Sequence, residues 1–161
     1  MKLILLLIAT ASLVYAPVSS IVELTQLRKP RASMAHKLPD YLIKECKRRG
    51  IDAEMAYWWG MAESSHRDYV ISHKDAYGRF QITEGWLREY ERITGRWRKP
   101  RPANDLLDDR FNCYLWAWTI AFWRRQGYED ETIAQIYLFG HFGHTVYGRK
   151  SEKYHNRIFG E

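Results

Sequence analysis

The most informative stretch of this chain is residues 63–81, which read Glu-Ser-Ser-His-Arg-Asp-Tyr-Val-Ile-Ser-His-Lys-Asp-Ala-Tyr-Gly-Arg-Phe-Gln. Residues 53–62 before them are rich in apolar and aromatic side chains, which is typical of a buried helix, and Asp52 is suited to be its N-cap. Glu63 therefore ends a buried helix. Burial raises the pKa of a carboxyl group, and a glutamate that is protonated near neutrality can act as a general acid. A purely structural Glu63, capping or pairing near the helix end, is the alternative.

Three blocks of the sequence resemble one known family. Residues 63–64, the serine at 72 and Ala-x-Gly-x-x-Gln at 76–81 are similar to the Glu-Ser, loop serine and Gly-Ala-x-Gly-Leu-Met-Gln of the soluble, goose-lysozyme-like lytic transglycosylases. Residues 134–140 stand where that family has Ala-x-Ala-Tyr-Asn-Ala-Gly, and residues 154–158 resemble its late Tyr-x-x-x-Ile. The resemblance covers about residues 39–159.

The resemblance implies a fold and a reaction. The fold would be a mainly α, lysozyme-like α+β domain, single and compact, with a small extended segment beside a catalytic cleft. The reaction would cleave peptidoglycan between N-acetylmuramic acid and N-acetylglucosamine, with Glu63 as acid and then as base, and would leave a 1,6-anhydro end. Most glycosidases use two carboxylates, whereas this reaction needs one. Such an enzyme is a carbon–oxygen lyase and requires no cofactor.

The resemblance also implies residues that contact the substrate or shape its cleft. Gln81 would offer its amide to an acetamido group, Tyr137 would place its hydroxyl against the Glu63 carboxyl, and Tyr154 would close the cleft. For the serines and for Tyr137, local or buried structural hydrogen bonds are the alternative. The candidate substrate-binding residues are Ser64, Ser72, Phe80, Gln81, Tyr137 and Tyr154.

Other positions depart from the family pattern and keep two rival functions open. Leu107 and Phe111 occupy the positions of a family asparagine and glycine, and Leu138 replaces a second asparagine. One rival is a muramidase of the same fold in which Asp68 or Asp75 orients water. The other is a catalytically silent protein that binds the cell wall or takes part in an assembly.

The N-terminal region has the pattern of an export signal. Residues 1–20 contain one lysine, an apolar run of fourteen residues and small residues near Ser20, so we expect a signal peptide that is cleaved there. An uncleaved anchor is the alternative, although about 20 apolar residues are needed to span a bilayer. Residues 21–38 are expected to form a basic lead-in, and residues 39–161 the domain. The location would be periplasmic or extracellular.

Charge limits the partners of the chain. The 161 residues carry a formal net charge of +6, and the basic side chains are scattered over residues 28–31, 44–49, 96–101 and 124–125 without a nucleic-acid-binding motif. An anionic polymer such as the cell wall, or a membrane surface, is the expected target. We therefore expect a monomer that binds peptidoglycan glycan strands and no nucleic acid. Delivery by an export or phage apparatus is left open.

The cysteines and histidines indicate no metal centre. Cys46 and Cys113 fall in helical patterns. Export would permit a disulfide between them, and two buried free thiols are the alternative. His141 and His144 lack a third ligand, so no metal is expected.

The predicted elements follow from periodicity and caps. Helices are expected at about 39–49, 53–65, 84–93, 104–122 and 131–139, and an extended segment at 78–82. Four aromatic residues of the fourth helix are read as core, with stacking on sugars as the alternative; they are Trp116, Trp118, Phe122 and Trp123.

Overall fold

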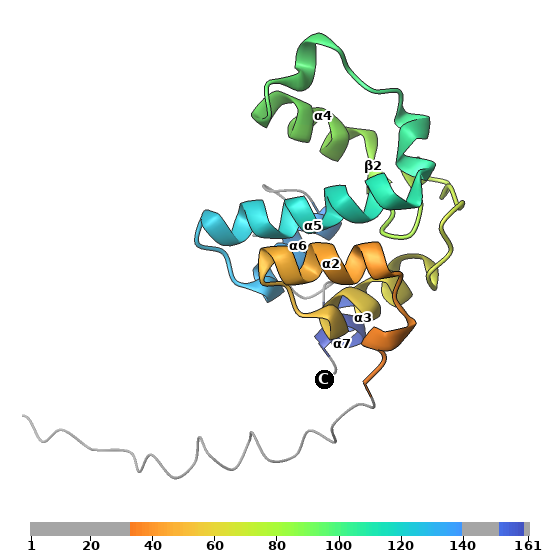
Figure 1. The fold of residues 1–161 in the computed structure, drawn as a ribbon, viewed down its shortest axis with the longest axis vertical. Helices are drawn as coiled ribbons and strands as arrows, with labels where there is room; N and C mark the ends of the chain where they lie inside the picture. The colour runs from red at the N-terminus through yellow and green to blue at the C-terminus, as the bar shows by residue number, and fades with distance from the viewer. Residues whose placement is uncertain (1–32, 140–151, 160–161) are drawn as a thin grey trace, which may run out of the picture. The chain divides into compact units, whose positions relative to one another are not determined.

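The computed structural model describes residues 33–139 and 152–159, which form a mainly helical domain with one small sheet (Figure 1). The predicted mainly helical α+β class is confirmed. In chain order the elements are η1 (Ala35–Lys37), α2 (Asp40–Arg49), α3 (Ala53–Ser64), β1 (Ala76–Tyr77), β2 (Ile82–Thr83), α4 (Glu84–Ile93), η2 (Arg96–Arg98), η3 (Ala103–Leu107), α5 (Asp109–Arg125), α6 (Asp130–Phe139) and α7 (Glu152–Phe159).

Local caps set the helix boundaries near the predicted positions. α2 ends at Gly50, whose φ of 65° favours glycine, and the Asp52 carboxylate accepts a hydrogen bond of 3.0 Å from the Glu54 amide at the start of α3. The predicted helix at 104–122 is wrong at its start. Asp108 is extended and caps α5 by accepting from the Phe111 amide at 2.9 Å, so the chain before it forms the separate 3₁₀ turn η3.

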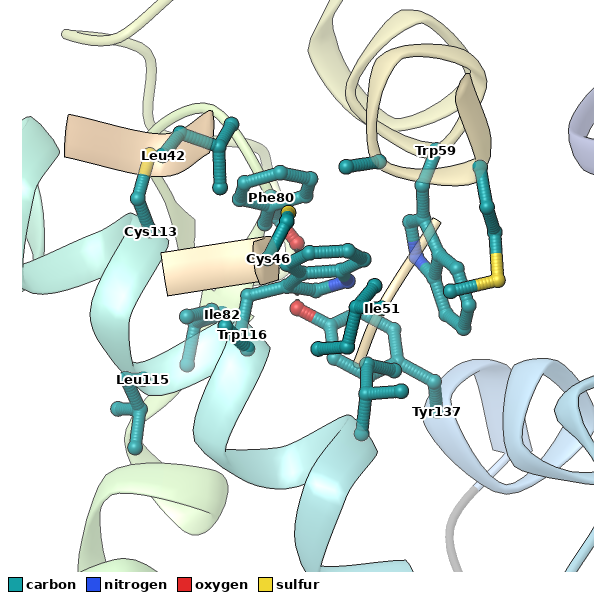
Figure 2. Packing of buried hydrophobic residues seen from close by; sticks show 14 of the residues in the cluster. Leu42, Cys46, Ile51, Trp59, Phe80, Ile82, Cys113, Leu115, Trp116 and Tyr137 are labelled. Atoms are coloured by element: carbon teal, nitrogen blue, oxygen red, sulfur yellow. Dashed lines mark hydrogen bonds between the residues drawn. The ribbon is translucent and has the colours of Figure 1, made fainter. Parts of the chain in front are cut away.

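The core forms around α3, which is buried on most sides, as predicted. α3 contacts α2 and α7, and α2 lies along α5. Figure 2 shows Phe80 lying against Trp116, and their rings stack with centroids 4.3 Å apart. The interpretation of the α5 aromatic face as core is confirmed for the fully buried Trp116. Trp118 and Trp123 are only partly buried and pack on the rim of this cluster.

The folded unit begins earlier than Pro39, the start predicted from the sequence. The Glu54 carboxylate accepts hydrogen bonds from the Ser33 hydroxyl and from the amides of Met34 and Ala35, and Leu38 is buried in the core. Residues 33–38 are therefore part of the domain rather than of a loose lead-in. The predicted signal peptide and most of the lead-in lie outside the described residues.

Both cysteines are buried thiols and no disulfide joins them, so the second alternative for this pair is the one observed. Burial raises the pKa of Cys46 to about 12. Among the described residues, no helix is long and apolar enough to cross a membrane.

Candidate active site

Glu63 lies in the last turn of α3, where the sequence places it, and its carboxyl is half-buried. The Tyr154 hydroxyl of α7 donates a hydrogen bond to Oε1 of Glu63. Burial raises the pKa of Glu63 to about 7, although the hydrogen bond from Tyr154 acts in the opposite direction. A carboxyl with this pKa exists in both protonation states at neutral pH.

Aromatic side chains surround this carboxyl. The rings of Trp59 and Tyr154 meet edge to face at 6.3 Å, and the Trp59 and Tyr137 rings do so at 5.4 Å. The buried Trp59 N–H has no hydrogen-bond partner in the described part of the chain, but its proximity to Glu63 acts to lower the pKa of that carboxyl. The surroundings of Glu63 are therefore largely apolar, and the Tyr154 hydroxyl is the one donor that the described residues give the carboxyl.

The segment facing α3 is a hairpin turn. β1 and β2 pair antiparallel, with Tyr77 opposite Ile82, so residues 78–81 form the turn and the predicted extended segment is wrong there. Gly78 has a φ of 70°, and a Cβ at this position would lie 2.6 Å from the side-chain nitrogen of Asn112. Glycine is thus required both by the backbone conformation and by the close contact.

Asn112 of α5 holds this turn, and the sequence analysis missed it. Its Oδ1 accepts from the Phe80 amide at 3.0 Å, and its Nδ2 donates to the carbonyls of Tyr77 and Leu106, each at 2.9 Å. Asn112 is fully buried. An isolated amide within the apolar residues of α5 was the available signal, because a buried polar side chain needs partners.

Two predicted site residues also bind the turn rather than an open cleft. The Tyr137 hydroxyl, expected against the Glu63 carboxyl, donates to the Phe80 carbonyl at 2.6 Å, which is the structural alternative for this tyrosine; the Glu63 charge still acts to raise its pKa. The buried Ser64 hydroxyl donates to the Arg79 carbonyl at 2.8 Å. Phe80 is fully buried against Trp116, so it is a core residue and not an exposed cleft wall.

The loop residues mainly serve local structure. Gln81 Nε2 donates to the Gly78 carbonyl at 2.9 Å and to the Val70 carbonyl at 3.4 Å, which leaves its own carbonyl oxygen for a ligand. The Ser72 hydroxyl accepts from the amides of Lys74 and Ala76, as in the structural alternative. Of the six candidate substrate-binding residues, Tyr154 alone has a hydrogen bond to Glu63 among the described contacts.

A buried ionic network also holds the turn at residues 78–81 through the side chain of Arg79. Arg79 donates to both carboxylate oxygens of Asp109, at 2.9 Å and 2.8 Å, and its Nη1 lies 3.2 Å from Nδ1 of His66. The Tyr41 hydroxyl also donates to Asp109. Burial raises the pKa of Asp109, but the hydrogen bonds from Arg79 and Tyr41 outweigh it and hold that pKa below its ordinary value. This network joins α2, the turn and α5.

His66 gives the fold a predicted sensitivity to acid. Burial and the Arg79 charge lower its pKa from 6.5 to about 4, so the unfolded chain binds a proton in this window while the folded protein does not. The contribution of His66 to the free energy of unfolding should therefore fall as the pH drops from 6.5 towards 4, opposite in sign to the contribution of the raised Glu63 pKa. His66→Gln removes this contribution and leaves that of Glu63, so the unfolding free energy of wild type minus that of His66→Gln should fall as the pH drops through this window, measured by urea unfolding at several pH values. The exposed His36→Gln is the control, and an unchanged slope in His66→Gln would contradict the assignment.

The carboxylates proposed to orient water in the rival muramidase lie in the loop after α3. Asp75 is exposed, and Asp68 is half-buried beside Tyr41 and Arg110 in a surface pocket of about 480 Å³. In the described residues, no three His, Cys, Asp or Glu side chains converge as metal ligands. His141 and His144 lie outside the described residues.

No protein-family model matches this chain, and no curated protein is significantly similar to it.

Proposed function

We propose that this chain is an exported, peptidoglycan-cleaving lytic transglycosylase in which Glu63 acts first as acid and then as base. The observation that carries the proposal is the half-buried carboxyl at the end of α3, with a pKa of about 7 and a tyrosine hydroxyl as donor. The substrate class comes from the sequence resemblance, and the proposed partner is the glycan strand of peptidoglycan.

A pKa near 7 suits a group that must first donate a proton and then accept one. In the first step, protonated Glu63 would give its proton to the bridging oxygen between the two sugars, while the acetamido carbonyl of the muramic acid stabilises the developing cation. In the second step, the Glu63 carboxylate would take the proton from the C6 hydroxyl, which closes on C1. One carboxyl group then completes the cycle without consuming water.

The neighbours of Glu63 have matching roles in this cycle. Tyr154 would donate to the carboxylate formed after the first step and so stabilise it. The aromatic side chains of Trp59 and Tyr137 would limit the water that competes with the C6 hydroxyl. The clamp of Asn112, Tyr137 and Ser64 on residues 78–81 would keep the turn rigid next to the acid.

The proposal is tested by measuring the masses of the muropeptides that the protein releases from peptidoglycan. Purified protein is incubated with peptidoglycan, and the soluble muropeptides are analysed by mass spectrometry beside Glu63→Gln. We expect products lighter by one water than hydrolytic ones, absent with Glu63→Gln and present with the surface control Glu84→Gln. Hydrated reducing ends would instead establish a muramidase. Wall binding without products from any form would favour the silent binder.

A further inference from the structure

The loop between α4 and η3 exposes a large aromatic side chain among cations. Residues 95–101 read Gly-Arg-Trp-Arg-Lys-Pro-Arg and include η2; we call them the basic loop. Trp97 is 60% exposed, more than any other tryptophan among the described residues. The Arg98 guanidinium lies over its ring, 5.2 Å from the ring centroid. A tryptophan combines a large apolar ring with a polar N–H and is enriched at interfaces, so this exposed indole among cations is a candidate contact for a partner.

The cations of the basic loop line a hollow. A pocket of about 400 Å³ is bordered by Gly95, Arg96, Arg98, Lys99 and Arg101. Within the described residues, Arg101 pairs with Asp105 at 3.1 Å, whereas Arg96, Arg98 and Lys99 make no ion pair. The loop therefore presents uncompensated positive charge beside the exposed indole.

The loop is held in place by the domain. The Arg101 amide donates to the Glu91 carboxylate at 2.6 Å, and Arg88 donates to the Arg101 carbonyl at 2.9 Å. Glu91 is 2% exposed, and Arg96 lies over the Tyr90 ring at 5.6 Å. In Figure 1 this segment arches outward beyond α4. Because its base is anchored, little conformational entropy would be lost when the tip binds.

A second arginine cluster lacks these features. Arg48, Arg49, Arg124 and Arg125 border another surface pocket, but Arg48 and Arg49 pair with Glu45, and Arg124 pairs with Asp130. No exposed large aromatic residue accompanies them among the described residues. Positive charge alone therefore does not distinguish the basic loop; the exposed Trp97 does.

We propose that the basic loop docks the domain on the surface of an anionic lipid bilayer. A tryptophan side chain is favoured at the headgroup level, where its ring leaves water and its N–H stays hydrogen-bonded. Arg96, Arg98 and Lys99 would meet lipid phosphates, to which cations are attracted. A soluble anionic polymer without rings or apolar surface, such as polyphosphate, would neutralise the charges but would leave the indole in water. This inference is independent of the proposed catalytic function.

The test compares vesicles of phosphatidylcholine with vesicles of equal parts phosphatidylcholine and phosphatidylglycerol, using sedimentation of the full chain. For each variant, the readout is the partition coefficient for the anionic vesicles divided by that for the neutral vesicles. All variants contain the apolar residues 3–16, so any contribution of these residues cancels when the ratios of two variants are compared. Each cation near an anionic surface is worth about fivefold in partition, so Arg98→Glu/Lys99→Glu should lower the ratio by at least about 25-fold. Trp97→Ala should lower binding to the anionic vesicles several-fold.

The matched control, Lys44→Glu/Arg125→Glu, makes the same change in net charge at exposed positions outside the loop and should retain most of the ratio. Equal losses in the control and in the loop variant would overturn the proposal in favour of net charge alone. Binding that is unaffected by Trp97→Ala, with soluble polyphosphate bound through the same cations, would assign the loop to an anionic polymer and would also overturn it. Thermal unfolding checks that each variant is folded.

Discussion

Glu63→Gln is expected to lower the rate of peptidoglycan cleavage by about 10²–10⁴-fold, the range associated with loss of a general acid–base group. The amide keeps the shape of the side chain but can neither give nor take the proton. Release of soluble muropeptides over time measures the rate. Glu84→Gln, at an exposed position in the first turn of α4, should retain the wild-type rate.

The same variant should make the folded protein more stable at pH 8. Because the Glu63 pKa is raised from 4.5 to about 7, the folded protein holds a proton that the unfolded chain loses in this window, and the contribution of Glu63 to stability falls as the pH rises through it. Glutamine is not charged and escapes this loss, so the free energy of unfolding should rise by about 1–3 kcal/mol at pH 8. Urea unfolding of both proteins provides the measurement. Full activity, or lower stability than wild type at pH 8, would contradict the role of Glu63.

Asp109→Leu is expected to destabilise the fold by about 3–5 kcal/mol, because it leaves the Arg79 guanidinium buried without its counter-charge. The side chains of Arg79 and Asp109 are only 9% and 11% exposed. The turn at residues 78–81 should also shift, since the Arg79 carbonyl accepts the hydrogen bond from Ser64. Muropeptide release should therefore fall together with stability, and urea unfolding measures the second effect.

A double variant separates the ion pair from simple packing. Arg79→Met/Asp109→Leu removes both charges, and it should recover much of the stability that Asp109→Leu loses. The exposed pair Arg92–Glu89 provides the matched control, because Glu89→Leu should cost less than about 1 kcal/mol at a solvated position. A small loss in Asp109→Leu, or no recovery in the double variant, would argue against the buried pair.

The two tyrosines near Glu63 illustrate where prediction from the sequence reached its limit. Both Tyr137 and Tyr154 were expected at the site, and the hydrogen bond to the carboxyl was assigned to the first. In the structure Tyr154 donates to Glu63, while Tyr137 donates to the Phe80 carbonyl. A hydroxyl can reach any nearby acceptor, so its partner depends on how α6 and α7 pack against α3.

The features predicted correctly from the sequence depend on neighbouring residues: the end of α2 at Gly50, the start of α3 after Asp52, the burial of α3, and the place of Glu63 in its last turn. Helical periodicity and caps act over a few residues and are legible in a single chain. The contacts between residues far apart in the chain were not predictable in this way; they are Tyr154 with Glu63, Asn112 with the turn, and Asp109 with Arg79. Each of these polar groups has many chemically acceptable partners, and the packing of the helices selects one, because a buried group left unpaired would cost free energy.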